Sequence, residues 1–255
     1  MSRPIRVVVD GPLIRISLAR PKLNVLDREL NRTLAAAIRE HAKDPAVAVI
    51  LIDGGESTGF SAGVEVADHT PDKVGGMLED FHAAIRAAWE AECVTVAAIH
   101  GFALGGGLEL ALSCDLVIAE ENARLAFPEI GLGCYPPVAA AMLPGRVGWA
   151  MASQLVLGGE PITVARAHHL GLVNYMCAAG TLAREIPLAL RPILEKSPAV
   201  LREAKLAMRE GLAHAPSAAL GRIEHRYLTS LMKLEDANEG VRAFMEKRAP
   251  EFRNR

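Results

Sequence analysis

The sequence has few of the features that mark nucleic-acid-binding proteins. Aromatic residues make up only 4% of the 255 residues, and the formal net charge is −2. Lysine and arginine do not gather into a basic run. Because nucleic-acid binding relies on clustered cations, and often on aromatic platforms for bases, we predict no nucleic-acid partner.

Cysteine is also scarce. The four cysteines, Cys93, Cys114, Cys134 and Cys177, are widely spaced, and no C-x-x-C pair occurs. This spacing predicts neither a zinc site nor a disulfide framework. We expect ordinary thiols in a reducing compartment, and no metal.

Long apolar runs are absent as well. No stretch reaches the roughly 20 apolar residues that a membrane-spanning helix needs. Residues 1–9 read as a charged strand rather than a secretory signal. We therefore expect a cytoplasmic protein without a membrane partner.

Hydrophobic residues make up 51% of the sequence, which is enough for a substantial core. Strand and helix signals alternate in the first part, and mainly helix is expected after residue 137. The predicted strands are 5–9, 13–18, 47–52, 94–99 and 116–119. The predicted helices are 28–43 with Asp27 as its cap, 74–91, 101–114, several after 192 with breaks near Pro198 and Pro216, and a charged one over 236–247. We predict an α/β core over residues 1–190 and a helical region over 191–255.

The segment His100 to Leu112 is the most informative. Gly105, Gly106 and Gly107 stand together in a run that is otherwise apolar. Each glycine costs a helix roughly 1 kcal/mol relative to alanine, so three in a row need a reason. Glycine lets backbone N–H groups approach a ligand closely, and a helix start suits an anion. The segment therefore predicts a binding site for a developing negative charge.

Glu109 lies in the same segment and is its only charged residue. It follows Gly106 by about one helical turn, so both can face one space. A buried carboxylate beside a donor-rich helix start is a candidate general acid or base. Pairing with an arginine or capping a neighbouring element is the alternative interpretation.

Two loops add weaker signals. Residues 60–66 follow a buried strand, and their small residues would let a second N–H reach the same place. Residues 127–133 hold a second carboxylate, Glu129, in a constrained loop. Taken alone, the first would be an ordinary turn and Glu129 an exposed side chain.

Together these motifs resemble the crotonase (enoyl-CoA hydratase/isomerase) superfamily. Residues 60–66 resemble the loop F-x-A-G-A-D-I, and 104–115 resemble A-L-G-G-G-x-E-L-A-x-x-C-D. Residues 128–133 resemble P-E-[IV]-x-L-G, and 239–248 resemble E-G-x-x-A-F-x-E-K-R. The motifs stand in family order and the resemblance covers essentially the whole chain.

The resemblance implies an α/β fold of the ClpP/crotonase type: a spiral of ββα units with a C-terminal helical region, assembled as homotrimers or homohexamers. It implies an acyl-CoA thioester substrate, an oxyanion hole from the N–H groups of Val64 and Gly106, and acid/base work by Glu109 and Glu129. No separate cofactor is implied, because coenzyme A is part of the substrate. The residues that it implies for binding substrate or CoA are Lys22, Ala62, Gly63, Val66, Gly105, Pro128, Phe244 and Lys247.

The chain departs from the family after Glu129. The family carries a stretch close to G-x-x-P-x-x-G-G-[ST]-Q-R-L, whereas residues 133–143 here include Pro136-Pro137. Pro137 has no N–H, so water must be held differently if the family uses that donor. This turn, the short segment 20–24 and the unusual segment 66–72 are similar to cyclohexa-1,5-diene-1-carbonyl-CoA hydratases of benzoyl-CoA breakdown. They favour a cyclic or otherwise non-linear enoyl- or dienoyl-CoA.

Other interpretations remain open at this point. His69 follows the first loop and could touch substrate, although an exposed loop histidine is the simpler interpretation. The chain could be an enoyl-CoA isomerase, a ring-cleaving hydrolase or a binding module without catalysis. The two glutamates favour an enoyl-CoA hydratase. Such an enzyme adds water to an α,β-unsaturated acyl-CoA, or removes water in the reverse reaction to form one.

Overall fold

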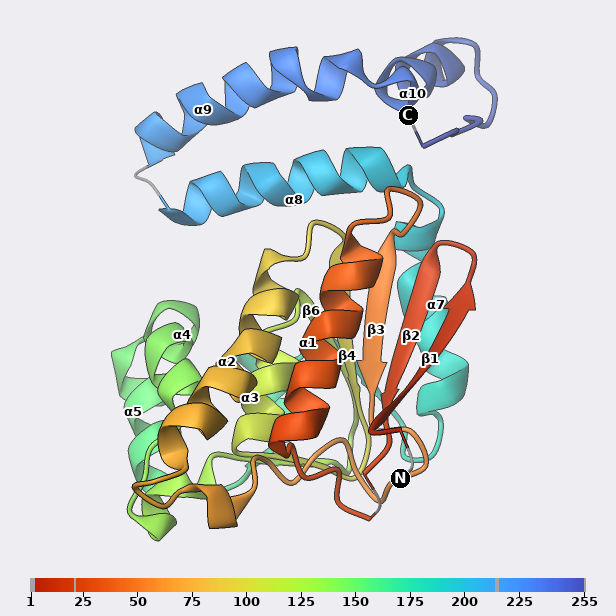
Figure 1. Ribbon diagram of the computed structural model, residues 1–255. Coiled ribbons are helices and arrows are strands. Elements are labelled where there is room, and N and C mark those ends of the chain that lie inside the picture. Colours follow the sequence, from red (N-terminus) through yellow and green to blue (C-terminus); the bar gives the residue numbers. More distant parts are fainter. Residues whose placement is uncertain (1–2, 21, 214–215, 255) are drawn as a thin grey trace.

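The structure is a computed structural model that describes residues 3–20, 22–213 and 216–254 (Figure 1). The strands are β1 (Ile5–Asp10), β2 (Leu13–Leu18), β3 (Val49–Asp53), β4 (Val94–Ile99), β5 (Phe102–Leu104), β6 (Leu116–Glu120), β7 (Arg124–Ala126), β8 (Ile162–Thr163) and β9 (Tyr175–Cys177). The helices are α1 (Arg28–Ala42), α2 (Val74–Glu90), α3 (Gly106–Leu112), α4 (Pro137–Val147), α5 (Trp149–Gly158), α6 (Val164–His169), α7 (Leu182–Leu194), α8 (Pro198–Ala213), α9 (Pro216–Thr229) and α10 (Glu235–Met245). Short 3₁₀ helices are η1 (Val66–Asp68), η2 (Pro128–Leu132) and η3 (Leu231–Lys233).

The larger sheet has the order β1-β2-β3-β4-β6-β9 among the described residues, and all its pairs except β1–β2 are parallel. A smaller sheet has the order β5-β7-β8. The chain moves from one sheet to the other as it advances, because β4 is followed by β5 and β6 by β7. This alternation produces the predicted spiral.

The larger sheet is covered on both faces. Ile50 and Ile52 of β3 belong to the main core, which also contains residues of α1, α2 and α3. Val49 and Leu51 point the other way, into a second cluster with Leu182, Ile186 and Leu190 of α7. A strand buried on both faces has a continuous apolar run, which is why residues 47–52 could be recognised in the sequence.

The prediction of one helix over 101–114 is wrong. Residues 102–104 form β5, and α3 begins only at Gly106. The break lies at Gly105, whose φ of 51° and ψ of −127° cannot continue either element. The short strands β7, β8 and β9 were also not predicted, because strands of two or three residues have no readable period.

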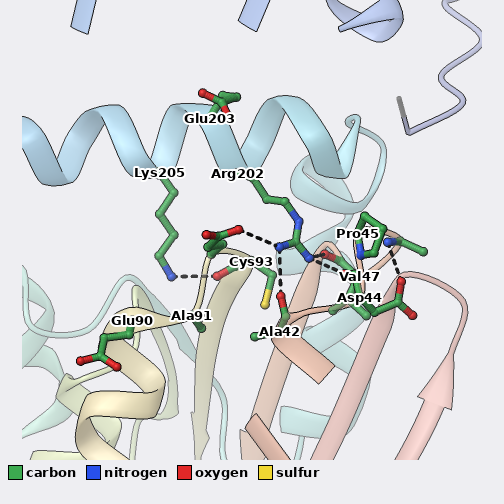
Figure 2. Close-up of polar contacts among 12 residues, drawn as sticks. Ala42, Asp44, Pro45, Val47, Glu90, Ala91, Cys93, Arg202, Glu203 and Lys205 are labelled. Atoms are coloured by element: carbon green, nitrogen blue, oxygen red, sulfur yellow. Dashed lines mark hydrogen bonds and ion pairs between the residues drawn. The ribbon is translucent and has the colours of Figure 1, made fainter. Parts of the chain in front are cut away.

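Helices α8, α9 and α10 form a layer above one end of the sheet (Figure 1). The expected division at residue 190 falls inside α7, which packs on the larger sheet. Cations on α8 hold this layer to the core by capping carbonyl groups at the ends of other elements (Figure 2). Arg202 donates to the oxygens of Ala42 (3.0 Å) and Val47 (3.3 Å), and Lys205 to that of Cys93 (2.7 Å). The Ala42 oxygen lies at the end of α1, where carbonyl groups lack partners and attract cations, whereas Val47 and Cys93 lie just before β3 and β4.

Lys205 is expected to be the strongest of these anchors. It is 4% exposed, and its Nζ also contacts Asp115 Oδ2 at 2.5 Å. Burial lowers the pKa of Lys205, while Asp115 opposes that change. We predict that Lys205→Met destabilises the protein by about 2–4 kcal/mol, because the Cys93 carbonyl loses its donor and Asp115 loses its cationic partner, keeping only the two donors from Thr95. Urea unfolding measures this, with exposed Lys233→Met as the control; equal losses in both variants would contradict it.

Candidate active site

The loop over residues 60–64 lies beside β5, which leads into α3. Ser61 and Ala103 form a parallel bridge, and the Leu104 N–H donates to the Ser61 oxygen at 2.9 Å. Val64 bridges to Leu26 on the other side. These pairings carry Val64 to the start of α3, although 42 positions separate it from Gly106 in the numbering.

The N–H groups of Val64 and Gly106 are neighbours. A methyl group added to Gly106 would lie 3.4 Å from the Val64 nitrogen, and one added to Gly63 would lie 3.4 Å from the Gly106 nitrogen. Gly106 is the first residue of α3, where N–H groups have no partner within the helix. Neither N–H donates to another group in the described part of the chain. Two free donors side by side can hold one developing oxyanion.

Gly105 lets a carboxylate approach the start of α3. A Cβ at this position would lie only 2.4 Å from Glu129 Oε1. Its φ of 51° also belongs to the left-handed region that favours glycine. The Gly105 N–H donates to Ala126 at 2.9 Å, so it is not available to a ligand.

Glu109 is 2% exposed and lies in the first turn of α3. Its Oε1 accepts hydrogen bonds from the N–H groups of Val138 (2.8 Å) and Ala139 (2.9 Å), at the start of α4. Glu109 therefore pairs with no arginine among the described residues, but its side chain does cap a neighbouring element, the start of α4, as the other alternative interpretation expected. Its second oxygen has no partner in the described part of the chain.

Glu129 comes from η2 and is half-buried rather than exposed. Its Oε2 is buried and has no hydrogen-bond partner among the described residues. A buried polar atom without a partner is uncommon in proteins and often marks a site for a ligand or water.

Burial raises the pKa of both carboxyl groups. The pKa of Glu109 rises to about 7, chiefly through burial and also through the nearby Glu129, against the two backbone donors. Burial raises the pKa of Glu129 too, and His69 acts in the opposite direction. Two carboxyl groups with raised pKa values in one space are suited to proton transfer near neutral pH.

The raised pKa of Glu109 makes a testable prediction about stability. An unfolded glutamate has a pKa of 4.5, so the folded protein binds this proton more tightly. The resulting stabilisation is complete below the unfolded pKa of 4.5. It is lost as the pH rises through the folded pKa of about 7. Glu109→Gln avoids this loss, so its stability relative to wild type should increase by about 2–3 kcal/mol between about pH 5 and about pH 8. Denaturant unfolding at the two pH values measures this; a difference independent of pH would contradict it.

A cavity of about 290 Å³ joins these groups. Glu109, Glu129, His69 and Val64 line it, together with a wall from α2 that includes Met77 and Phe81. The remaining lining residues are Val74, Leu78, Gly133, Cys134, Tyr135, Pro136 and Pro137. The cavity thus combines an apolar wall with a few polar groups, as small-molecule sites do.

The structure brings together some of the sequence-predicted residues and not others. Val64, Glu109 and Glu129 line the cavity, and Gly63, Gly105 and Gly106 lie at the paired N–H groups. Ala62 donates its N–H to Leu23, Val66 is exposed in η1, and Pro128 begins η2. Lys22 and Lys247 are exposed and do not line the cavity. The Phe244 side chain lies outside the part that the structure describes.

Sequence reasoning missed several residues of the site. Residues 74–91 were predicted only as a helix, with no part in the site. Asn24, at a φ of 48°, is fully buried, and its Nδ2 donates to Gly54 (2.8 Å) and Phe60 (3.0 Å). It fixes the loop that carries Val64, and a lone asparagine in a turn gave no sign of this. His69, left open above, does line the cavity, and its Nδ1 is 3.1 Å from the Glu65 oxygen.

No group of three or more His, Cys, Asp or Glu side chains in the described ranges could hold a metal ion. Within those ranges, no helix is both long and apolar enough to cross a bilayer.

Comparison with known families identifies the family and supports the fold. The sequence model of the family described as enoyl-CoA hydratase/isomerase matches residues 10–255. The chain belongs to the enoyl-CoA hydratase/isomerase family, as predicted.

Individual relatives match nearly the whole chain. Cyclohexa-1,5-dienecarbonyl-CoA hydratase of Thauera aromatica is 36% identical, over 100% of this chain and 98% of that protein. The 2,3-dehydroadipyl-CoA hydratase of Escherichia coli (strain K12) is 35% identical, over 95% of this chain and 96% of that protein. Among solved structures, Pseudomonas aeruginosa DspI matches with a TM-score of 0.92 and 30% identity, over 99% of this chain and 97% of that chain. The predicted crotonase fold is therefore confirmed.

Proposed function

We propose that this protein is a hydro-lyase that adds water to, or removes it from, the α,β double bond of an acyl-CoA thioester. The observation that carries this proposal is the meeting of two carboxyl groups, one buried and one half-buried, and two free backbone N–H groups around one cavity. Family membership supports the thioester substrate. An isomerase needs to move only a proton, so a second carboxyl group favours hydration.

In the proposed reaction, the thioester oxygen lies between the N–H groups of Val64 and Gly106. The free oxygen of Glu109 takes a proton from water, and the water oxygen attacks the β carbon. The electron pair of the double bond moves toward the thioester oxygen, where the two donors stabilise it. Glu129 then gives its proton to the α carbon, and exchange with solvent restores both glutamates. Coenzyme A is part of the substrate, and no other cofactor is proposed.

For the acyl group, we propose a cyclic dienoyl thioester of the cyclohexa-1,5-diene-1-carbonyl type as the second, narrower candidate. Pro136 and Pro137 line the cavity at the position where the sequence departs from the family. The relative from Thauera aromatica, whose name specifies that substrate, is 36% identical over the full chain. These observations favour a compact ring over a long linear chain.

A spectrophotometric assay with two substrates tests both levels of the proposal. The purified protein is given crotonyl-CoA and cyclohexa-1,5-diene-1-carbonyl-CoA side by side. We expect hydration of the cyclic diene with the higher kcat/KM. Faster turnover of crotonyl-CoA would contradict the narrower candidate alone, and hydration of neither would contradict the proposed activity.

We further propose a cytoplasmic homotrimer or homohexamer, with 191–255 as its oligomerisation and CoA-covering region. Trp149 and Leu157 of α5 are 77% and 65% exposed, and apolar side chains this open favour burial against another subunit. Phe244 and Lys247 would then help to hold CoA in a neighbouring subunit. Light scattering after size exclusion tests this assembly; a monomer would contradict it.

A further inference from the structure

The start of helix α4 has an unusual set of donors. The first four N–H groups of a helix have no partners within it. In α4 the first position is Pro137, which has no N–H, and the next two N–H groups donate to Glu109 Oε1. The fourth, from Ala140, donates to the Pro136 oxygen at 2.9 Å. Every donor at this helix start is therefore accounted for.

Any residue other than proline at position 137 would add one more N–H donor to the start of α4. Pro137 lines the cavity and directly precedes the two donors to Glu109. Its N–H would point out of the same helix end, toward the Glu109 carboxylate or a water beside it. Proline removes that donor and also fixes φ at a helical value, so the first turn is set in place.

The other groups around Glu109 do not donate hydrogen bonds to its carboxyl group. Glu129, from η2, is the charged neighbour on one side, and His69 faces the cavity from the segment after η1. Cys134 and Tyr135 line it from the loop before α4. Helix α2 contributes only apolar side chains, among them Met77 and Phe81. The start of α4 thus supplies the only hydrogen bonds from the described residues to the Glu109 side chain.

We propose that Pro137 is a positioning residue for the hydration reaction: it restricts Glu109 to two backbone donors on Oε1 and leaves the other oxygen free to take the proton from water. This inference rests on the proposed role of Glu109 as the base. The inference also accounts for the missing N–H at position 137. The proposed water would be held by the carboxyl groups of the site and not by the start of α4.

A direct titration of Glu109 tests the inference without any substrate. The protein is labelled with ¹³C at the glutamate carboxyl carbons, and Glu109→Gln identifies the Glu109 signal by its loss. Pro137→Ala and Pro137→Gly both restore an N–H, which stabilises the ionised carboxyl. We expect the titration midpoint of Glu109 to fall by about one pH unit in both variants. Because the base becomes weaker, kcat measured well above the midpoint should fall by up to about tenfold, while KM changes less than about twofold.

Pro144→Ala is the matched control, since it removes a proline from the same helix, beyond the donors to Glu109. Its Glu109 midpoint should equal that of wild type. An unchanged midpoint in the two Pro137 variants would overturn the inference. A shift in only one of them would also overturn it, because the added N–H is what the two share. Failure of the proposed function would appear differently, as absence of hydration by the wild-type protein.

Discussion

Replacing Glu109 with glutamine is expected to lower kcat for hydration by about 10²–10⁴. Glutamine has nearly the shape of glutamate, and its oxygen can still accept from Val138 and Ala139. It cannot take a proton from water. The loss therefore falls on the chemical step, and KM should change little. Initial rates with saturating acyl-CoA measure this effect.

Glu129→Gln should cause a loss of similar size, because it removes the proton donor to the α carbon. The double variant should be hardly worse than either single variant, since residues that act as a unit give non-additive losses. Exposed Glu121→Gln is the matched control and should keep full activity. Activity within about threefold of wild type in Glu109→Gln would contradict the assigned role, because general bases typically contribute far more.

Gly106→Ala carries the second large expected effect. The added methyl group would lie 3.1 Å from Val64 Cγ1, 3.2 Å from Phe81 Cζ and 3.4 Å from the Val64 nitrogen. It would occupy space beside the two paired N–H groups and push them apart. Loss of one oxyanion donor typically costs about 10²–10³ in kcat, and we expect a loss in this range.

Gly145→Ala provides the control for this variant. Gly145 lies in α4, has a φ outside the left-handed region, and has open space around its added Cβ. It should therefore keep its activity. Both alanine variants should retain the far-UV circular dichroism of the wild type. A Gly106→Ala protein with unchanged kcat would contradict the position of the oxyanion hole.

The parts of the fold that the sequence predicted are those governed by local patterns. Helix α1 begins after Asp27, whose side chain accepts from the Leu30 N–H at 2.8 Å, as expected of a cap. Strand β3 has the apolar run of a strand that is covered on both faces. The run of glycines at 105–107 also predicted a close approach of the backbone to another group.

What the sequence could not predict depends on contacts between distant residues. The division of residues 101–114 into β5 and α3 follows from pairing with β7, which is itself too short to recognise. The hydrogen bonds from α4 to Glu109 span 29 and 30 positions, so neither helix alone indicates them. Pro137 was read as a missing donor, and its place at the first turn of a helix emerged only from the fold. The roles of Asn24 and the α2 wall likewise follow from tertiary contacts.

Isotope labelling distinguishes addition of water to an enoyl thioester from movement of its double bond. The protein is incubated with crotonyl-CoA, or with the cyclic diene if that is preferred, in water enriched in ¹⁸O and deuterium. We expect a hydroxyacyl-CoA product in which ¹⁸O is bonded to carbon and one deuterium has been added, with both labels lost in Glu109→Gln. A product in which the double bond has moved and no ¹⁸O has entered would contradict hydration and assign the site to isomerisation.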